Sequence, residues 1–182
     1  MTDNPEKPDK PDCVPEGAIH LGTFNLAGKE PGTYTAGVFK LYGDPEKDLL
    51  GSADSFRQAA DRCLNGCKVE PGVEMLTVPA AVCAAFAVEL YLKYIHLAET
   101  GKRPPKGHKL VALFCACSAE VQEALRKARP DLASVLARND EHFVAARYHH
   151  ETGQFSFRQQ ELLQLAESFS EFIRNRYRDR IA

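Results

Sequence analysis

The chain has 182 residues, which is enough for one sizeable hydrophobic core and too few for two. Its hydrophobic fraction of 44% and charged fraction of 26% are ordinary for a globular protein. The formal net charge of -2 excludes a uniformly basic nucleic-acid coat, so any phosphate binding must come from local basic patches.

The first 43 residues differ in composition from the rest of the chain. Residues 1–16 are rich in Pro, Lys, Asp and Glu, which bury too little apolar surface to offset the entropy lost on ordering. They predict a disordered tail, and their charge predicts that no signal peptide is present. Residues 17–43 are rich in glycine with short apolar pieces, and they predict an arm that forms one or two short strands or packs on a partner.

From residue 44 onward, apolar residues recur at helical spacing. Asp44-Pro45 is typical of a helix N-cap followed by a first-turn proline, and Asn65-Gly66 of a helix end. Further helices are expected at 77–100, at 110–125 with a break capped by Ser118, at 132–136, at 139–152 and from Ser156 onward. Residues 44–182 therefore predict an all-α domain, an antiparallel up-and-down bundle of four to five main helices, with no strand beyond the arm.

The six cysteines are expected to be reduced thiols that pack as small apolar groups in a cytoplasmic protein. Cys63 and Cys67 lie one helical turn apart and could share a metal ion. The paired Cys and His spacings of zinc sites are missing, however, so core packing is the favoured interpretation. No metal and no cofactor are predicted.

The stretch from Val78 to Leu97 is the most apolar part of the chain, but Glu89 and Lys93 interrupt it. A membrane span needs about 20 mostly apolar residues with few or no charges, so a buried central helix is favoured and no membrane association is expected. Glu89 and Lys93 are spaced as a helical ion pair. If Glu89 is buried it needs a cation from another helix, and Arg147 is the candidate. A structural ion pair of Glu89, Lys93 and Arg147 is favoured over a catalytic carboxylate.

Residues 102–109, with the sequence Lys-Arg-Pro-Pro-Lys-Gly-His-Lys, form a basic loop before a helix. The amides of that helix start would suit a phosphate, which makes His108 and Lys109 candidate binding residues. The alternative is a solvated loop between helices, with His108 near the helix start.

Residues 138–151 hold three histidines, two arginines and three carboxylates. On one continuous helix Arg138 and His142 would share a face, so both could meet one phosphate. His142 would then exchange a proton while Arg138 stabilises the developing charge, with Asn139 and Arg147 as further binding candidates. The alternative for each histidine is an exposed helical residue without a function of its own.

Three segments together resemble the HEPN domain superfamily, closest to bacterial HEPN-like proteins found near abortive-infection proteins. They are the sequence Ala-Val-Glu-Leu-Tyr-Leu-Lys at 87–93, the Gly-His-Lys-Leu start at 107–110, and Phe-Val-Ala-Ala-Arg-Tyr at 143–148 with Glu151. The resemblance implies a helical bundle that is usually dimeric. Many members are metal-independent ribonucleases of toxin–antitoxin, phage-defence or RNA-processing systems.

The active motif of those ribonucleases is Arg, a polar residue, and then His after four to six intervening residues. Arg138, Asn139 and His142 have the required residue types, but three residues separate Arg138 from His142, one fewer than the motif requires. By residue type, the resemblance implies that Arg138 and His142 are catalytic, and that a homodimer acts on RNA. An antitoxin or a nucleotidyltransferase-like protein is the partner expected in such systems. The alternative is a non-catalytic dimerising module that binds a partner protein or a nucleotide ligand.

Overall fold

The computed structural model describes residues 44–65, 76–140, 144 and 159–181, together with the backbone of two short strands at 67–69 and 72–74. These residues belong to one compact unit, Gly43–Ala182. The predicted tail at 1–16 and arm at 17–43 lie outside the described residues. So does most of the helix expected at 139–152.

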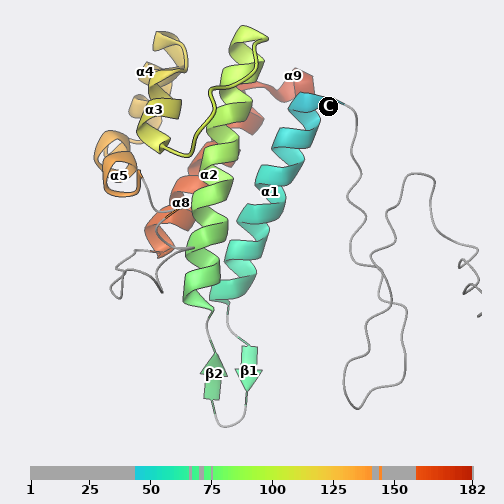
Figure 1. The fold of residues 1–182 in the computed structure, drawn as a ribbon, viewed down its shortest axis with the longest axis vertical. Coiled ribbons are helices and arrows are strands. Elements are labelled where there is room, and N and C mark those ends of the chain that lie inside the picture. Colours follow the sequence, from blue (N-terminus) through green and yellow to red (C-terminus); the bar gives the residue numbers. More distant parts are fainter. Residues whose placement is uncertain are drawn as a thin grey trace, which may run out of the picture. The chain divides into compact units, whose positions relative to one another are not determined.

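Three long helices, α1 (Pro45–Leu64), α2 (Thr77–Thr100) and α8 (Gln159–Arg176), form the body of the unit (Figure 1). The short helices are α3 (Leu110–Cys115), α4 (Ala119–Ala128), α5 (Leu132–Arg138) and α9 (Arg178–Ile181). The most extensive contacts join α1 to α2, followed by those between α2 and α8. The predicted all-α helical bundle is confirmed.

Local capping chemistry sets several helix boundaries where the sequence predicted them. The Asp44 side chain accepts a hydrogen bond of 3.0 Å from the Glu46 N–H at the start of α1, with Pro45 in its first turn. Ser118 likewise caps α4 by accepting a bond of 3.3 Å from the Val121 N–H. This cap divides the expected helix at 110–125 into α3 and α4.

The connection between α1 and α2 is a small β-hairpin, although a loop without strands was expected there. β1 (Cys67–Val69) pairs antiparallel with β2 (Gly72–Glu74), and Lys68 lies opposite Val73. Because α1 ends at Leu64, Cys63 and Cys67 do not share a helix, and the expectation that they lie one helical turn apart is wrong.

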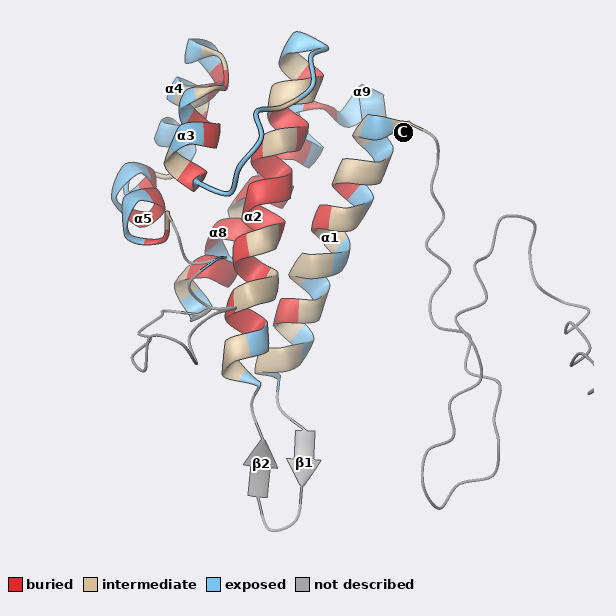
Figure 2. Ribbon diagram, viewed as in Figure 1, coloured by how far each residue is buried: buried red, intermediate tan, exposed pale blue. Residues whose placement is uncertain are grey.

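The core is centred on α2, most of which is buried (Figure 2). Tyr91, Tyr94 and Ile95 of α2 and Phe169 of α8 are among its largest fully buried side chains. By length and composition, α2 is the one described helix that could cross a membrane. The bundle, however, buries 67% of its most apolar window, as is usual for the core helix of a soluble protein.

Two polar networks connect the long helices. Asp54 on α1 accepts hydrogen bonds from the Tyr91 hydroxyl at 2.6 Å, from Ser170 at 3.3 Å and from Arg174 at 2.7 Å. Burial, together with the hydrogen bond to Asp54, raises the pKa of the Tyr91 hydroxyl well above its ordinary value.

The second network gathers around Glu99 near the end of α2. The Tyr177 hydroxyl donates to its carboxylate at 2.7 Å, Ser118 at 3.1 Å and the Arg176 Nε at 3.5 Å. Burial alone would raise the pKa of Glu99. The hydrogen bonds and the positive charge of Arg176 outweigh burial and lower that pKa below its ordinary value.

Candidate functional site

A fully buried carboxylate, Glu89, lies at the centre of the candidate site. Lys93, one turn further along α2, places its Nζ 2.6 Å from Glu89 Oε1. His108 places its Nδ1 2.9 Å from Oε2 and 3.1 Å from Oε1. An ionised carboxylate only accepts hydrogen bonds, so the imidazole donates its Nδ1–H. Two donors therefore compensate a buried charge that would otherwise be costly.

The loop at 101–109 places His108 against Glu89, which lies 19 residues earlier in the sequence. Gly107, directly before the histidine, has a φ of 122°. Residues with a side chain rarely adopt this angle, so glycine suits the turn that directs His108 toward α2. Sequence reasoning treated His108 as a phosphate ligand or a solvated residue and missed its contact with Glu89. The one sequence feature that could have indicated this contact was the need of a buried Glu89 for a cationic partner.

Two adjoining pockets flank this cluster. The first, here called the Lys93 pocket, has a volume of about 710 Å³. The second, the Asp140 pocket, has a volume of about 500 Å³. Pro105 and Lys106 of the loop line both of them. Lys93 lines the first pocket and His108 lines the second, so both pockets adjoin the cluster around Glu89.

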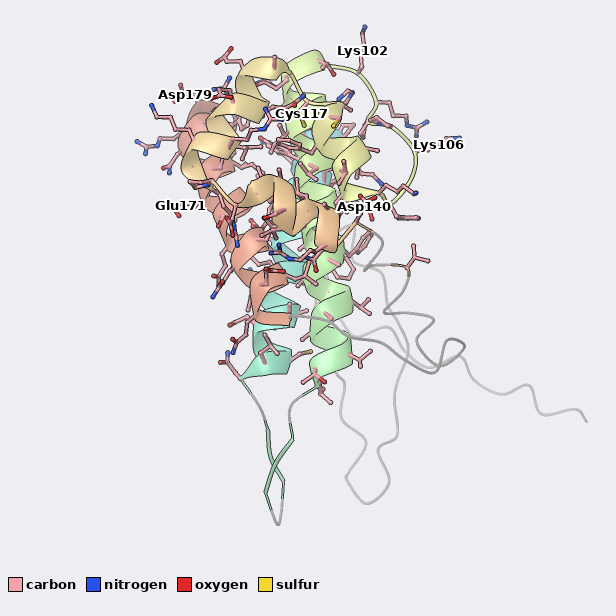
Figure 3. All side chains as sticks on the ribbon, turned by 90° about the vertical axis from the view of Figure 1, so that its left-hand side faces the viewer. Lys102, Lys106, Cys117, Asp140, Glu171 and Asp179 are labelled. Atoms are coloured by element: carbon pink, nitrogen blue, oxygen red, sulfur yellow. The ribbon has the colours of Figure 1, made fainter. Side chains whose placement is uncertain are left out.

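The exposed side of the loop is strongly basic. Lys102, Arg103 and Lys106 are exposed, and none of them forms an ion pair with a residue that the structure describes. Lys102 and Lys106 project from the loop (Figure 3). His108 and Lys109, both predicted binding residues, are exposed and line the Asp140 pocket. Phosphate groups are the natural ligands of such a surface.

Arg138, one of the two predicted catalytic residues, lies in a neighbouring part of the bundle. Arg138 is the last residue of α5, and its side chain is 48% exposed. It forms an ion pair of 2.6 Å with Glu161 of α8. Asn139 is buried and donates to the same Glu161 at 3.1 Å and to the Val135 carbonyl at 2.8 Å.

The helix α5 ends at Arg138, so one continuous helix does not carry Arg138 and the region of His142. His142 and Arg147 both lie outside the described residues. Within the described part of the chain, the partners of Glu89 are Lys93 and His108, and the pairing with Arg147 stays a prediction.

Asp140 directly follows Asn139 and fixes the start of α3. Its Oδ1 accepts a hydrogen bond of 2.7 Å from the Val111 N–H, across 29 residues of sequence. This bond brings the α5 end and the basic loop to the same pocket. Among the described residues no group of three or more His, Cys, Asp or Glu is arranged to hold a metal ion.

The fold and the site define a helical bundle in which Lys93 and His108 contact a buried carboxylate, Glu89, beneath a basic loop. A family model of the HEPN domain matches residues 47–176, and the chain belongs to this family. Neither the curated proteins nor the solved structures contain a match. Membership indicates a nucleic-acid-related function in general terms, and HEPN domains are commonly dimeric and generally soluble.

Proposed function

We propose that this protein binds single-stranded RNA through the basic loop at 101–109. The observation that supports this proposal is the set of exposed cations at Lys102, Arg103 and Lys106, which have no ion-pair partner among the described residues. Arg103 and Lys106 line the Lys93 pocket, and Lys106 also lines the Asp140 pocket, so two of these cations adjoin pockets that could receive nucleotides. Cationic grooves that follow a phosphate backbone are the usual basis of such binding.

The test is fluorescence anisotropy with a labelled single-stranded RNA over a range of salt concentrations. The double variant Arg103→Ala with Lys106→Ala should weaken binding and reduce the log–log salt slope by about 1.4, at about 0.7 for each lost phosphate contact. The double variant Lys127→Ala with Arg178→Ala removes the same two charges from exposed positions on α4 and α9 and should bind like the wild type. Equal losses in both variants would refute a role for the loop.

The second candidate is metal-independent ribonuclease activity using Arg138 and His142. The observation that favours it is a half-exposed arginine side chain at a helix end, paired with Glu161 and next to the buried Asn139. Arg138 would stabilise the charge that develops on the phosphate, and His142 would exchange the proton of the attacking 2'-hydroxyl. The 2'-oxygen would bond to the adjacent phosphorus as the P–O5' bond breaks, and the released 5'-oxygen would take up a proton. The products would carry a 2',3'-cyclic phosphate end and a 5'-hydroxyl end.

Ribonuclease activity is measured by incubating the purified protein with a mixed RNA pool and EDTA, beside Arg138→Ala and His142→Ala. Cleavage by the wild type that both variants lose would support the assignment. An inactive wild type, or variants as active as the wild type, would favour the alternative of a non-catalytic module that binds a partner protein or a nucleotide.

We extend the proposal to a cytoplasmic homodimer in a defence or toxin–antitoxin system, with an antitoxin or a nucleotidyltransferase-like protein as partner. Light scattering after size-exclusion chromatography measures the oligomeric state, and a monomer at micromolar concentration would argue against the dimer. Co-purification with the products of neighbouring genes tests the partner.

A further inference from the structure

The Asp140 pocket combines three kinds of surface that a single nucleotide could use. Pro105, Leu113 and Val144 provide apolar walls. Lys106 at the rim provides positive charge. The carboxyl group of Asp140 lies on the same lining, and Figure 3 shows it on the side of the molecule from which Lys106 projects. Pockets for small ligands are typically apolar with a few polar groups that fix orientation.

The two oxygens of Asp140 have different roles. Oδ1 accepts the Val111 N–H at 2.7 Å and thereby fixes the start of α3. Oδ2 has no hydrogen bond to any residue in the described part of the chain. The capping bond holds the carboxyl group in place, so Oδ2 and the remaining lone pair of Oδ1 are presented as a rigid pair of acceptors.

A rigid pair of acceptors selects among the four RNA bases by chemistry alone. Guanine presents two adjacent N–H donors, N1–H and N2–H, on its Watson–Crick edge. On that edge adenine has one donor beside one acceptor, cytosine has one donor beside two acceptors, and uracil has one donor between two acceptors. An acceptor turned toward the carboxylate is repelled and left without a hydrogen bond.

We propose that the Asp140 pocket binds an unpaired guanine base of the RNA, with Asp140 accepting the N1–H and N2–H donors. The inference rests on the proposed RNA binding, because the loop would hold the phosphates on either side of the bound base. Unpaired RNA bases are commonly recognised through hydrogen bonds to their Watson–Crick edges. Lys106 at the pocket rim would contact the phosphate nearest the guanine.

The test compares labelled five-nucleotide RNAs that differ only at the central base: UUGUU, UUAUU, UUCUU, UUUUU and an inosine probe, UUIUU. The wild type should bind UUGUU about tenfold more tightly than the A, C and U probes, a preference that corresponds to one or two charge-assisted hydrogen bonds. Inosine keeps N1–H and lacks the 2-amino group, so its affinity should be intermediate.

Asp140→Asn is the matched variant, because asparagine retains Oδ1 for the Val111 N–H and replaces Oδ2 with an N–H₂ donor. It should keep the thermal stability of the wild type and bind all five probes with nearly equal affinity.

Tight but equal binding of all probes by the wild type would refute the guanine site and leave RNA binding intact. Absence of binding to every probe would refute both. A guanine preference that Asp140→Asn retains would also overturn the inference. If this variant fails to fold, the inosine comparison on the wild type still decides the question.

Discussion

At the scale of single residues, the fully buried Glu89 places the strongest constraint on its surroundings. Its two described partners come from different parts of the chain, Lys93 from the same helix and His108 from the basic loop. Neutralising a buried carboxylate requires partners of good geometry, and removing one of them leaves a charge that is poorly compensated. The cluster therefore connects the stability of α2 with the position of the loop.

Lys93→Met should lower the free energy of unfolding by about 3 kcal/mol, because it removes one of the two described donors to a buried charge. Adding Glu89→Gln should recover part of that loss, since a neutral amide needs no ammonium partner. Urea denaturation of both variants measures the difference. Lys127→Met, at an exposed position, is the control and should change stability by less than about 0.5 kcal/mol. A double variant no more stable than Lys93→Met would contradict the assigned pairing.

At the scale of elements, the three long helices meet at Asp54, which accepts bonds from α2 and α8 while lying on α1. Hydrophobic packing brings the helices together without fixing their relative rotation or register. A carboxylate with three donors on two neighbouring helices requires a specific alignment. We therefore expect the Asp54 network to determine register more than it adds to total stability.

Tyr91→Phe removes the donor of the 2.6 Å bond to Asp54 and should destabilise the protein by about 1–2 kcal/mol. Tyr94→Phe is the matched control. Tyr94 is also buried on α2, and its hydroxyl makes no hydrogen bond within the described residues, so the change should be nearly neutral. Chemical denaturation curves compare the two. Equal effects of both substitutions would show that the bond to Asp54 adds no stability.

At the scale of the whole molecule, the Glu99 network joins α2, α4 and the C-terminal end of α8, and it responds to pH. The pKa of Glu99 is lower in the folded protein than its ordinary value. Its stabilising contribution is complete above the unfolded pKa of about 4.3 and is lost as the pH falls through the lower folded pKa.

Glu99→Gln should therefore reduce the melting temperature at pH 7 more than at pH 3. Thermal unfolding of both proteins between these pH values measures the gap, which is the melting temperature of the wild type minus that of the variant. Glu123→Gln, at an exposed position on α4, is the control and should leave the gap close to zero throughout. A Glu99→Gln gap that stays constant with pH would contradict the lowered pKa.

The sequence predicted the helices well because their signals are local. The Asp44 cap, the Ser118 cap and the apolar periodicity of α1 and α2 depend on neighbouring residues alone. The β1–β2 hairpin was missed because its strands have three residues each, too few to show an alternating pattern.

The candidate site was harder to predict because its contacts span long distances in sequence. The contacts of Glu89 with His108 and of Asp140 with the Val111 N–H depend on how the loop packs against the bundle, which periodicity does not reveal. The exposed basic loop itself was evident from composition. The carboxylate partner of Arg138 was not, because Glu161 lies 23 residues away.

The close pairing of α1 and α2 has a consequence for the newly made chain. These helices are neighbours in sequence and make the most extensive contact between described elements, so they can associate once Thr100 has left the ribosome. Their later partner α8 begins about 60 residues further on, at Gln159. Until then the apolar surface of α2 that α8 covers is open to water. A nascent chain of this length is therefore a natural client for chaperones that bind exposed apolar helices.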